Sequence, residues 1–226
     1  MLPRDRDIYA SAPLRQLLDE QARAMAANLQ RCFGTHALLV SASELDVPPA
    51  LPMLGCWIRL CVQDGRYAGD LRAATDEPLP FIDDAFELVL LRHALEVVAL
   101  AGDLLAEAVR VLAPGGILAV TGVHPLSGWA PWFRWRARGT HRVLQMPLQL
   151  RHRLVRAGLE IERVQRVGHL WPGATANHPV NLGGGYVLLA RKRRRAITPL
   201  RIKPAPLRVP SSSQLSPGTR RHATFT

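Results

Sequence analysis

The spacing of apolar side chains predicts a helix followed by two strands in the first third of the chain. After Ser11 and Pro13, which suit a helix start, leucine and methionine side chains recur at helical spacing until Gly34 interrupts them. Residues 36–43 and 56–62 are apolar runs of strand length, and an Asp-Gly turn follows the second run. The chain therefore begins as helix, strand, strand.

The rest of the chain continues this alternation. Residues 86–91 form a continuous apolar run, which is typical of a strand buried on both faces. Residues 100–112 predict a helix that ends at the Pro-Gly-Gly turn of 114–116. The other predicted elements are strands 117–121, 160–167 and 186–190 and a basic helix at 148–157. Strands that alternate with helices predict an α/β domain with a mainly parallel sheet.

Two stretches lack a regular pattern. Residues 44–55 contain three prolines, so they cannot hold a long regular helix. From Arg191 onward the composition changes to arginine, proline, serine and threonine. We therefore predict an N-terminal helix that packs on the domain (1–35), an α/β domain (36–192) and a mostly disordered basic tail (193–226).

Charge is divided unequally along the chain. Residues 1–122 hold 10 arginines against 16 acidic residues, whereas residues 123–226 hold 19 arginines and lysines against only Glu160 and Glu162. A basic half of this kind suggests an anionic partner, such as nucleic acid, a phosphate-bearing substrate or lipid headgroups. A solvated tail that serves only solubility is the alternative, and the sequence leaves both open.

The cysteines and the N-terminus indicate a reducing compartment. Cys32, Cys56 and Cys61 form no Cys-x-x-Cys pair, so they favour small buried side chains over a disulfide scaffold or a metal site. Residues 1–10 lack the apolar segment of a signal peptide. We expect a cytoplasmic protein without a transmembrane segment.

Three stretches resemble one enzyme family in their order and spacing. They read LPFIDDAFELVLLRHALEVV from Leu79, LLAEAVRVLAPGGILAVTG from Leu104 and LVRAGLEIERVQRV from Leu154. They are similar to the fourth strand, the helix leading into the fifth strand, and the helix before the sixth strand of the class I S-adenosylmethionine-dependent methyltransferases. The wider chain also resembles a proteobacterial subgroup of that family that has a leading helix and a basic tail.

The resemblance implies a Rossmann-like sheet of seven mainly parallel strands, with the last strand antiparallel and helices on both faces. Ligands would bind at the carboxyl ends of the strands, where the strand order reverses. The implied cofactor is S-adenosylmethionine, and the implied function is methyl transfer to an acceptor that the subgroup does not specify. The alternative is a methyltransferase fold that has lost its cofactor and binds an anionic partner, either nucleic acid or acidic lipid.

In this family the first contact with the cofactor comes from a glycine-rich turn after the first strand. The matching residues here are Ser41, Ala42 and Ser43, which are small but contain no Gly-x-Gly. The proline-rich stretch replaces the helix that should follow. The resemblance thus places cofactor binding at a turn that departs from the family pattern.

The resemblance implies acidic residues at two further positions. Asp64 stands where the family accepts bonds from the ribose hydroxyls, although an ordinary Asp-Gly turn explains it equally well. Asp76 lies next to the position of the acid that contacts the adenine amino group, Thr75 occupies that position, and Asp70 is a second candidate. For each acid the alternative is a solvated loop residue.

Leu91, Arg92 and His93 follow the fourth-strand run and would border the methyl-bearing end of the cofactor. His93 is the candidate general base, because an unperturbed imidazole titrates near neutrality. The alternative is a structural histidine at the start of a helix.

The segment after the fifth strand would form the acceptor site. Its candidate residues are His124, Ser127, Trp129, Trp132 and Phe133, together with Arg134, Trp135, Arg136 and Arg138. Interleaved aromatic and arginine side chains can stack a planar acceptor and bind phosphate. They can equally form an amphipathic lid on a membrane surface, or a lid that packs its tryptophans on the core.

Overall fold

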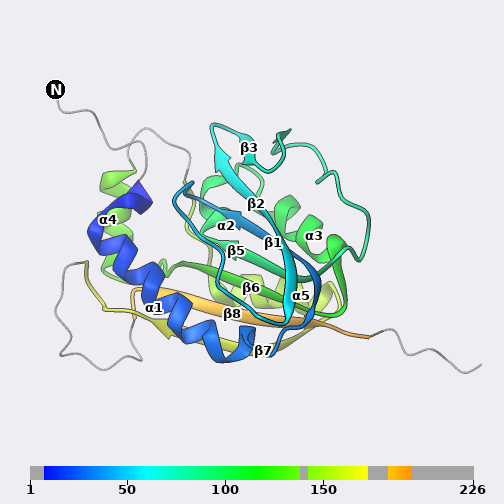
Figure 1. Cartoon of the computed structure of the whole chain (residues 1–226). Coiled ribbons are helices and arrows are strands. Elements are labelled where there is room, and N and C mark those ends of the chain that lie inside the picture. The colour runs from blue at the N-terminus through cyan, green and yellow to red at the C-terminus, as the bar shows by residue number, and fades with distance from the viewer. Residues whose placement is uncertain (1–7, 138–141, 173–182, 195–226) are drawn as a thin grey trace, which may run out of the picture. The chain divides into compact units, whose positions relative to one another are not determined.

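The computed structural model describes residues 8–137, 142–172 and 183–194. These residues form one eight-stranded sheet with helices on both of its faces (Figure 1). All of them belong to one unit, Met1–Arg195, and Ala196–Thr226 is a second unit. The predicted disorder of the tail therefore concerns residues that lie outside the described part of the chain, apart from Arg193 and Arg194.

Most elements lie where the apolar pattern predicts them. The strands are β1 Gly34–Ser41, β2 Leu54–Gln63, β3 Arg66–Gly69, β4 Ala73–Ala74, β5 Phe86–Arg92, β6 Leu112–Val123, β7 Leu159–Val167 and β8 Gly185–Lys192. The helices are the 3₁₀ turn η1 Ile8–Ala10, α1 Ala12–Leu29, α2 Ala94–Val97, α3 Ala101–Val111, α4 Trp129–Arg136 and α5 Pro147–Arg156. The elements not expected from the sequence are η1, α4 and the pair β3–β4.

The parallel centre of the sheet confirms the Rossmann-like fold. The strands lie in the order β4-β3-β2-β1-β5-β6-β8-β7. β1 pairs in parallel with β2 and β5, and β5 pairs in parallel with β6. β8 is antiparallel to both β6 and β7, as the resemblance implied for the last strand. Because the chain proceeds outward from β1 to β2 and later returns to β5 on the other side, the strand order reverses between β1 and β5. That position is the switch point.

The sheet has eight strands where the resemblance implied seven, and two of the eight, β3 and β4, extend the sheet beyond β2. Asp64 and Gly65 have positive φ angles of 48° and 74°, which suit a two-residue turn between antiparallel strands. β3 then pairs with β2, and β4 pairs with β3. Gly69 is required in β3, because a Cβ there would lie 2.3 Å from the carbonyl oxygen of Arg59. The hairpin and the helix-free segment 42–53 leave this half of the sheet with little helical cover.

The sheet separates two apolar layers. On one face α3 and α5 pack on a layer that includes Val89 and Leu91 of β5. On the other face Met25 of α1 packs on a layer that includes Leu88 and Leu90. Successive side chains of β5 thus enter opposite layers, as expected for a strand that is buried on both faces.

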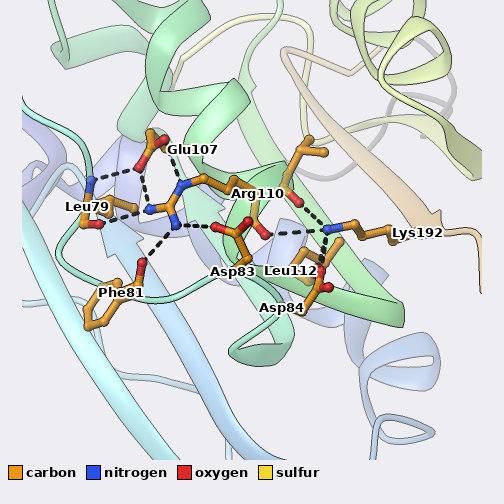
Figure 2. A network of polar contacts seen from close by, with 9 residues as sticks. Leu79, Phe81, Asp83, Asp84, Glu107, Arg110, Leu112 and Lys192 are labelled. Atoms are coloured by element: carbon orange, nitrogen blue, oxygen red, sulfur yellow. Dashed lines mark hydrogen bonds and ion pairs between the residues drawn. The ribbon is translucent and has the colours of Figure 1, made fainter.

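A polar network holds the loop before β5 against α3 (Figure 2). The guanidinium of Arg110 donates to the carbonyl oxygens of Leu79 and Phe81 at 2.9 and 2.8 Å, and to the carboxylates of Asp83 and Glu107. The Leu79 N–H donates to Glu107 at 2.8 Å. This network lies at the amino-terminal edge of the parallel strands. Residues 79–84, which begin the stretch that resembles the methyltransferase family, therefore stabilise the edge of the sheet opposite the switch point.

Lys192, the last residue of β8, adds further hydrogen bonds at this edge of the sheet (Figure 2). Its ammonium donates to the Asp84 carboxylate at 2.8 Å and to the carbonyl oxygens of Val109 and Leu112 at 2.7 and 2.6 Å. A lysine placed in this way satisfies the last carbonyl groups of a helix. α3 ends at Val111 and β6 begins at once, before the Pro-Gly-Gly residues 114–116, so the prediction that this turn ends the helix was wrong.

We expect Glu107→Gln to weaken the fold in a pH-dependent way. The hydrogen bond from Arg110 lowers the pKa of the Glu107 carboxyl below its ordinary value of 4.5, although burial opposes the shift. A lowered folded-state pKa adds stability above the ordinary value, and this gain is lost as the pH falls through the folded-state pKa. At neutral pH the variant should lose about 1–2 kcal/mol, and the loss should shrink as the pH falls below 4.5.

Urea denaturation of both chains at a series of pH values measures this difference. Glu77→Gln is the control, since it removes a carboxylate from an exposed position of the same loop and should change stability little. A loss for Glu107→Gln that stays constant over the whole pH series would contradict the explanation by the Arg110 contact.

Candidate functional site

The switch point brings six of the predicted site residues together. Ser41 ends β1 and Arg92 ends β5, and the N–H of Ala42 donates to the carbonyl of Arg92 at 3.0 Å. The backbone of Ser41 also pairs with that of His93. The residues that meet here are Ser41, Ala42, Ser43, Leu91, Arg92 and His93. The Leu91 side chain belongs to the core, so that residue offers only its backbone to this edge.

Three polar side chains form a row across the sheet at this edge. They are Ser41, Arg92 and Thr121. Arg92 pairs with Thr121, and Ser41 and Arg92 each follow the last residue pair of β1 and β5, Val40 and Leu91. Each lies two residues beyond a side chain of the layer that packs on α1, namely Leu39, Leu90 and Ala119. Since side chains two residues apart share a face, all three polar side chains point to the α1 face. The hydroxyl of Thr121 is buried and has no hydrogen-bond partner among the described residues.

Arg92 is bound by the loop that follows β1. Its guanidinium donates to the carbonyl of Val47 at 3.2 Å and lies 3.6 Å from the carboxylate of Asp46. Each of the two charged side chains is only 10% exposed, so water screens this ion pair weakly. The proline-rich segment thus folds back over the switch point, and Arg92 holds it there.

Two serines close the turn that replaces the glycine-rich loop. The hydroxyl of Ser41 donates to the carbonyl of Ser43 at 2.8 Å, and the hydroxyl of Ser43 accepts from the N–H of Leu45 at 3.3 Å. Both serines are buried. Serine hydroxyls that bond to the local backbone stabilise turns, which explains how the chain makes this turn without glycine.

A cavity of about 180 Å³ remains between this loop and the hairpin. Residues of β1, the loop, β2 and β3 line it, among them Leu39, Ser41, Ser43, Asp46, Arg59 and Gly69. Pockets for drug-sized ligands measure roughly 300–1,000 Å³. The cavity therefore has room for only part of such a ligand.

His93 is fully buried, and both of its ring nitrogens are engaged. Nδ1 lies 3.1 Å from the carboxylate of Glu96, and Nε2 lies 2.8 Å from the side-chain oxygen of Gln21. Gln21 reaches in from α1 and donates its amide to the carbonyl of Gly122 at 3.0 Å. Both ring nitrogens face oxygen acceptors, so the geometry favours the structural alternative for His93 over a general base.

Glu96 is the centre of this network. Its carboxylate also accepts hydrogen bonds from the hydroxyl of Tyr9 at 2.7 Å and from the N–H of Val123. Its backbone carbonyl accepts from the N–H of Val143 at 3.0 Å. One buried residue thus joins η1, the end of β6 and the segment before α5. A buried carboxylate requires such partners, because an unpaired charge in the interior is strongly unfavourable.

Sequence reasoning did not single out Glu96, Gln21, Asp46 or Thr121. A signal existed for Glu96, because an acid three residues after His93 lies on the same side of a helix in an otherwise apolar stretch. The other three give no such signal, since their roles depend on which distant segments meet.

Most of the predicted acidic residues do not reach the switch point. Asp64 occupies the hairpin turn and is exposed. Thr75 closes the same hairpin, because its N–H and hydroxyl donate to the turn at 3.0 and 2.8 Å, and Asp76 is exposed. Asp70 comes directly after Gly69, which lines the cavity. The carboxylate of Asp70 accepts a hydrogen bond from the backbone N–H of Arg59 in β2 at 2.7 Å.

Two predicted acceptor residues build the turn before α4. The N–H of His124 donates to the carbonyl of Gly184 at 2.7 Å, and the hydroxyl of Ser127 donates to the carbonyl of His124 at 2.6 Å. Burial, and next the positive charge of Arg166, lower the pKa of His124 below its ordinary value, which favours a neutral ring at pH 7. Its Nδ1 accepts from the N–H of Leu126 at 3.2 Å. The neutral ring therefore carries its proton on Nε2.

The aromatic residues of α4 divide between core and surface. Trp129 is buried, and its indole N–H donates to the carbonyl of His169 at 2.7 Å. The Trp132 ring is half-buried, 5.7 Å from the Trp129 ring. Phe133 is buried, whereas Trp135 is 57% exposed. One side of α4 thus packs on the core while Arg134, Trp135 and Arg136 stay exposed. Arg138 lies outside the described residues.

The cysteines do not gather into a metal site. Cys32 and Cys61 are buried, but Cys56 is exposed, so the prediction of a buried side chain was wrong for Cys56. Burial raises the pKa of the Cys32 thiol to about 11, which keeps it unreactive at neutral pH. No cluster of three or more potential metal-ligating side chains occurs within residues 8–137, 142–172 and 183–194. No helix in those ranges has the length and hydropathy needed to span a membrane.

Solved methyltransferase structures share this fold. An S-adenosylmethionine-dependent methyltransferase from Thermotoga maritima has a TM-score of 0.55 and 16% identity, with 79% of this chain and 90% of that chain covered. Another, from Mesorhizobium loti, has a TM-score of 0.51 and 17% identity, with coverage of 78% and 100%. At such identities the likeness shows the fold alone.

The sequence itself also matches known methyltransferases. Residues 52–120 match the methyltransferase domain family. The phthiotriol/phenolphthiotriol dimycocerosates methyltransferase 1 of Mycobacterium ulcerans (strain Agy99) is 38% identical over 76 residues, which are 33% of this chain and 28% of that protein. Residues 52–120 therefore resemble a methyltransferase domain in sequence, and the fold is that of S-adenosylmethionine-dependent methyltransferases.

The sequence matches cover only part of this chain and of the matched protein. The chain spans 28% of the length of the curated relative, so the activity and acceptor of the whole protein are matters for proposal. The matches give no support to a fold that only binds an anionic partner without methyl transfer. The basic tail invoked for such binding lies outside the described residues.

S-adenosylmethionine is the cofactor of this methyltransferase family. Chemically the switch point suits it, because the row of Ser41, Arg92 and Thr121 offers hydroxyl and guanidinium groups. The space does not suit it, because the cavity of about 180 Å³ cannot hold the whole molecule. The loop through Asp46 and Val47 lies over the switch point. The switch point is therefore closed over by this loop in the described conformation.

We expect Glu96→Ala to destabilise the protein by about 3–5 kcal/mol, since it leaves the buried polar groups of His93, Tyr9 and Val123 without their acceptor. Urea denaturation followed by tryptophan fluorescence measures the loss. Glu160→Ala, at an exposed position of β7, is the control and should stay within about 0.5 kcal/mol of the wild type. Equal stability of the two variants would contradict the role assigned to the buried network.

Proposed function

We propose that this chain is an S-adenosylmethionine-dependent methyltransferase that binds its cofactor between the carboxyl ends of β1 and β5. The main support is the meeting of the small residues Ser41, Ala42 and Ser43 with Arg92 at the switch point of the sheet. Open α/β sheets bind their ligands at this position.

The chain's part in such a reaction is to position the acceptor. A sulfonium supplies an activated methyl group, and transfer requires an acceptor held in line with the S–CH₃ bond in a site that excludes water. Tyr9, Trp129 and Phe133 form an apolar layer with Val123, and Ala42 packs against it. This layer would keep water from the switch point.

His93 has a positioning role in this proposal. Because its ring nitrogens lie within hydrogen-bonding distance of Glu96 and Gln21, it fixes the end of β5 relative to the middle of α1. The acceptor would then supply its own nucleophile without a proton transfer to His93.

The acceptor would approach along α4. Trp132 is half-buried and Trp135 is exposed there, and aromatic side chains suit an acceptor with a flat or apolar body. The relative from Mycobacterium ulcerans is named for methylation of phthiotriol and phenolphthiotriol dimycocerosates. Its likeness supports methyl transfer by this chain, whereas the acceptor class proposed here rests on the tryptophans.

Isothermal titration calorimetry of the full chain tests cofactor binding. S-adenosylmethionine and S-adenosylhomocysteine should both bind, with dissociation constants roughly between 1 μM and 1 mM. Ala42→Trp, which places a bulky ring in the turn after β1, should abolish binding. Leu45→Trp is the matched control, because Leu45 is 63% exposed on the same loop and the added ring stays in solvent.

Thermal melting establishes that each variant is folded before it is titrated. The same titration is made with Asp46→Asn, which removes the charge that holds the loop to Arg92. If neither the wild type nor this variant bound the ligand at millimolar concentration, the proposed function would be contradicted.

A further inference from the structure

The polar row at the switch point indicates which chemical group binds there. Arg92 carries the positive charge of the row and is 9% exposed. Thr121, its neighbour on β6, is 1% exposed, and its hydroxyl lacks a hydrogen-bond partner among the described residues. A buried hydroxyl without a partner is unfavourable, and an anionic ligand beside Arg92 would supply the missing acceptor.

Asp46 supplies the anion in the described conformation. Its carboxylate lies 3.6 Å from the guanidinium of Arg92, and the neighbouring Val47 carbonyl accepts from the same group. The side chains on either side of Asp46 add little to this contact, since Leu45 is 63% and Val47 is 69% exposed. Charge attraction to Arg92 is therefore a main force that keeps this loop over the switch point.

We infer that Arg92 and Thr121 form the binding site for a carboxylate of the ligand, and that Asp46 occupies the place of that carboxylate in the closed conformation. The inference rests on the proposed function, since S-adenosylmethionine carries a methionine carboxylate. Guanidinium groups bind carboxylates through two parallel hydrogen bonds. When the ligand carboxylate replaces the Asp46 carboxylate, the buried guanidinium of Arg92 keeps a negatively charged partner. The loop can therefore move away without leaving the Arg92 charge unpaired.

The inference also accounts for the small cavity. The space of about 180 Å³ is lined in part by Asp46 itself. Movement of the loop that carries Asp46 would enlarge this space in the same step that exposes Arg92 and Thr121 to the ligand.

Asp46→Asn tests the competition, because it keeps the side-chain shape and removes the competing charge. S-adenosylhomocysteine should bind this variant about tenfold more tightly than the wild type, as expected when a ligand no longer has to displace a closed state. Asp19→Asn makes the same chemical change at an exposed position of α1 and should leave the affinity unchanged. Hydrogen–deuterium exchange of residues 42–50 without ligand should be faster in Asp46→Asn.

Thr121→Val tests the carboxylate site, because it keeps the shape of the side chain and removes the hydroxyl. The affinity for S-adenosylhomocysteine should fall about fivefold. The affinity for 5′-methylthioadenosine, which has the same nucleoside and no carboxylate, should not change. The melting temperature should not fall, since the hydroxyl has no partner among the described residues of the folded chain.

The outcomes separate this inference from the proposed function. Binding of S-adenosylhomocysteine by the wild type and by Asp46→Asn with equal affinity would overturn the competition and leave the proposed function standing. Equal effects of Thr121→Val on both ligands, or no effect on either, would overturn the carboxylate site. No binding by any of these chains would overturn the inference and the proposed function together.

Discussion

A buried carboxylate must be surrounded by donors, and at Glu96 this requirement fixes how distant segments of the chain meet. Tyr9 and Val123 donate to it, and His93 links it to Gln21 of α1. If α1 moved relative to the sheet, a charge in the interior would lose part of its compensation. The network therefore holds the N-terminal helix and the ends of β5 and β6 in one arrangement. The same network keeps His93 in a left-handed backbone conformation with φ of 55°, which is unfavourable for a residue other than glycine.

The connection from β1 to β2 determines which groups at the switch point can bind an anion. A crossover helix would begin at the switch point and present free backbone N–H groups to a ligand. The proline-rich segment cannot do so, because it forms no helix. Positive charge at this edge comes instead from a side chain, Arg92, and a side chain can be neutralised by the chain's own loop. The proline-rich segment between β1 and β2 thus explains both why no helix begins at the switch point and why a loop covers it.

Local patterns were sufficient to predict most of the fold. The apolar run at 86–91 specified a strand buried on both faces, and β5 is such a strand. The Asp-Gly pair at 64–65 specified a turn, but only the positive φ angles of both residues send β3 back antiparallel. The acids near the start of the stretch from Leu79, Asp83 and Asp84, bond to Arg110 and Lys192. They stabilise the fold, whereas Arg92 further along the same stretch lies at the site.

The site was harder to predict, because its contacts join residues far apart in the sequence. Tyr9 and Glu96 are 87 positions apart, and Gln21 and His93 are 72 apart. No periodicity within a segment signals such pairs. Arg92 was expected to contact the cofactor, but its present partner Asp46 lies on a loop whose path no local pattern specifies.

The position of β8 sets the order in which the sheet can be completed. β8 is the last strand of the sheet in the sequence, yet it lies between β6 and β7, and β7 pairs with no other strand in the described part of the chain. During synthesis the edge of β7 stays unpaired until β8 has been made. The pairing of β8 with β6 joins residues far apart in the sequence, and such pairing forms slowly. The arrival of β8 also brings Lys192 to the end of α3. Completion of the sheet and capping of that helix are thus a single late event, and a chain that stops before β8 should remain prone to aggregation.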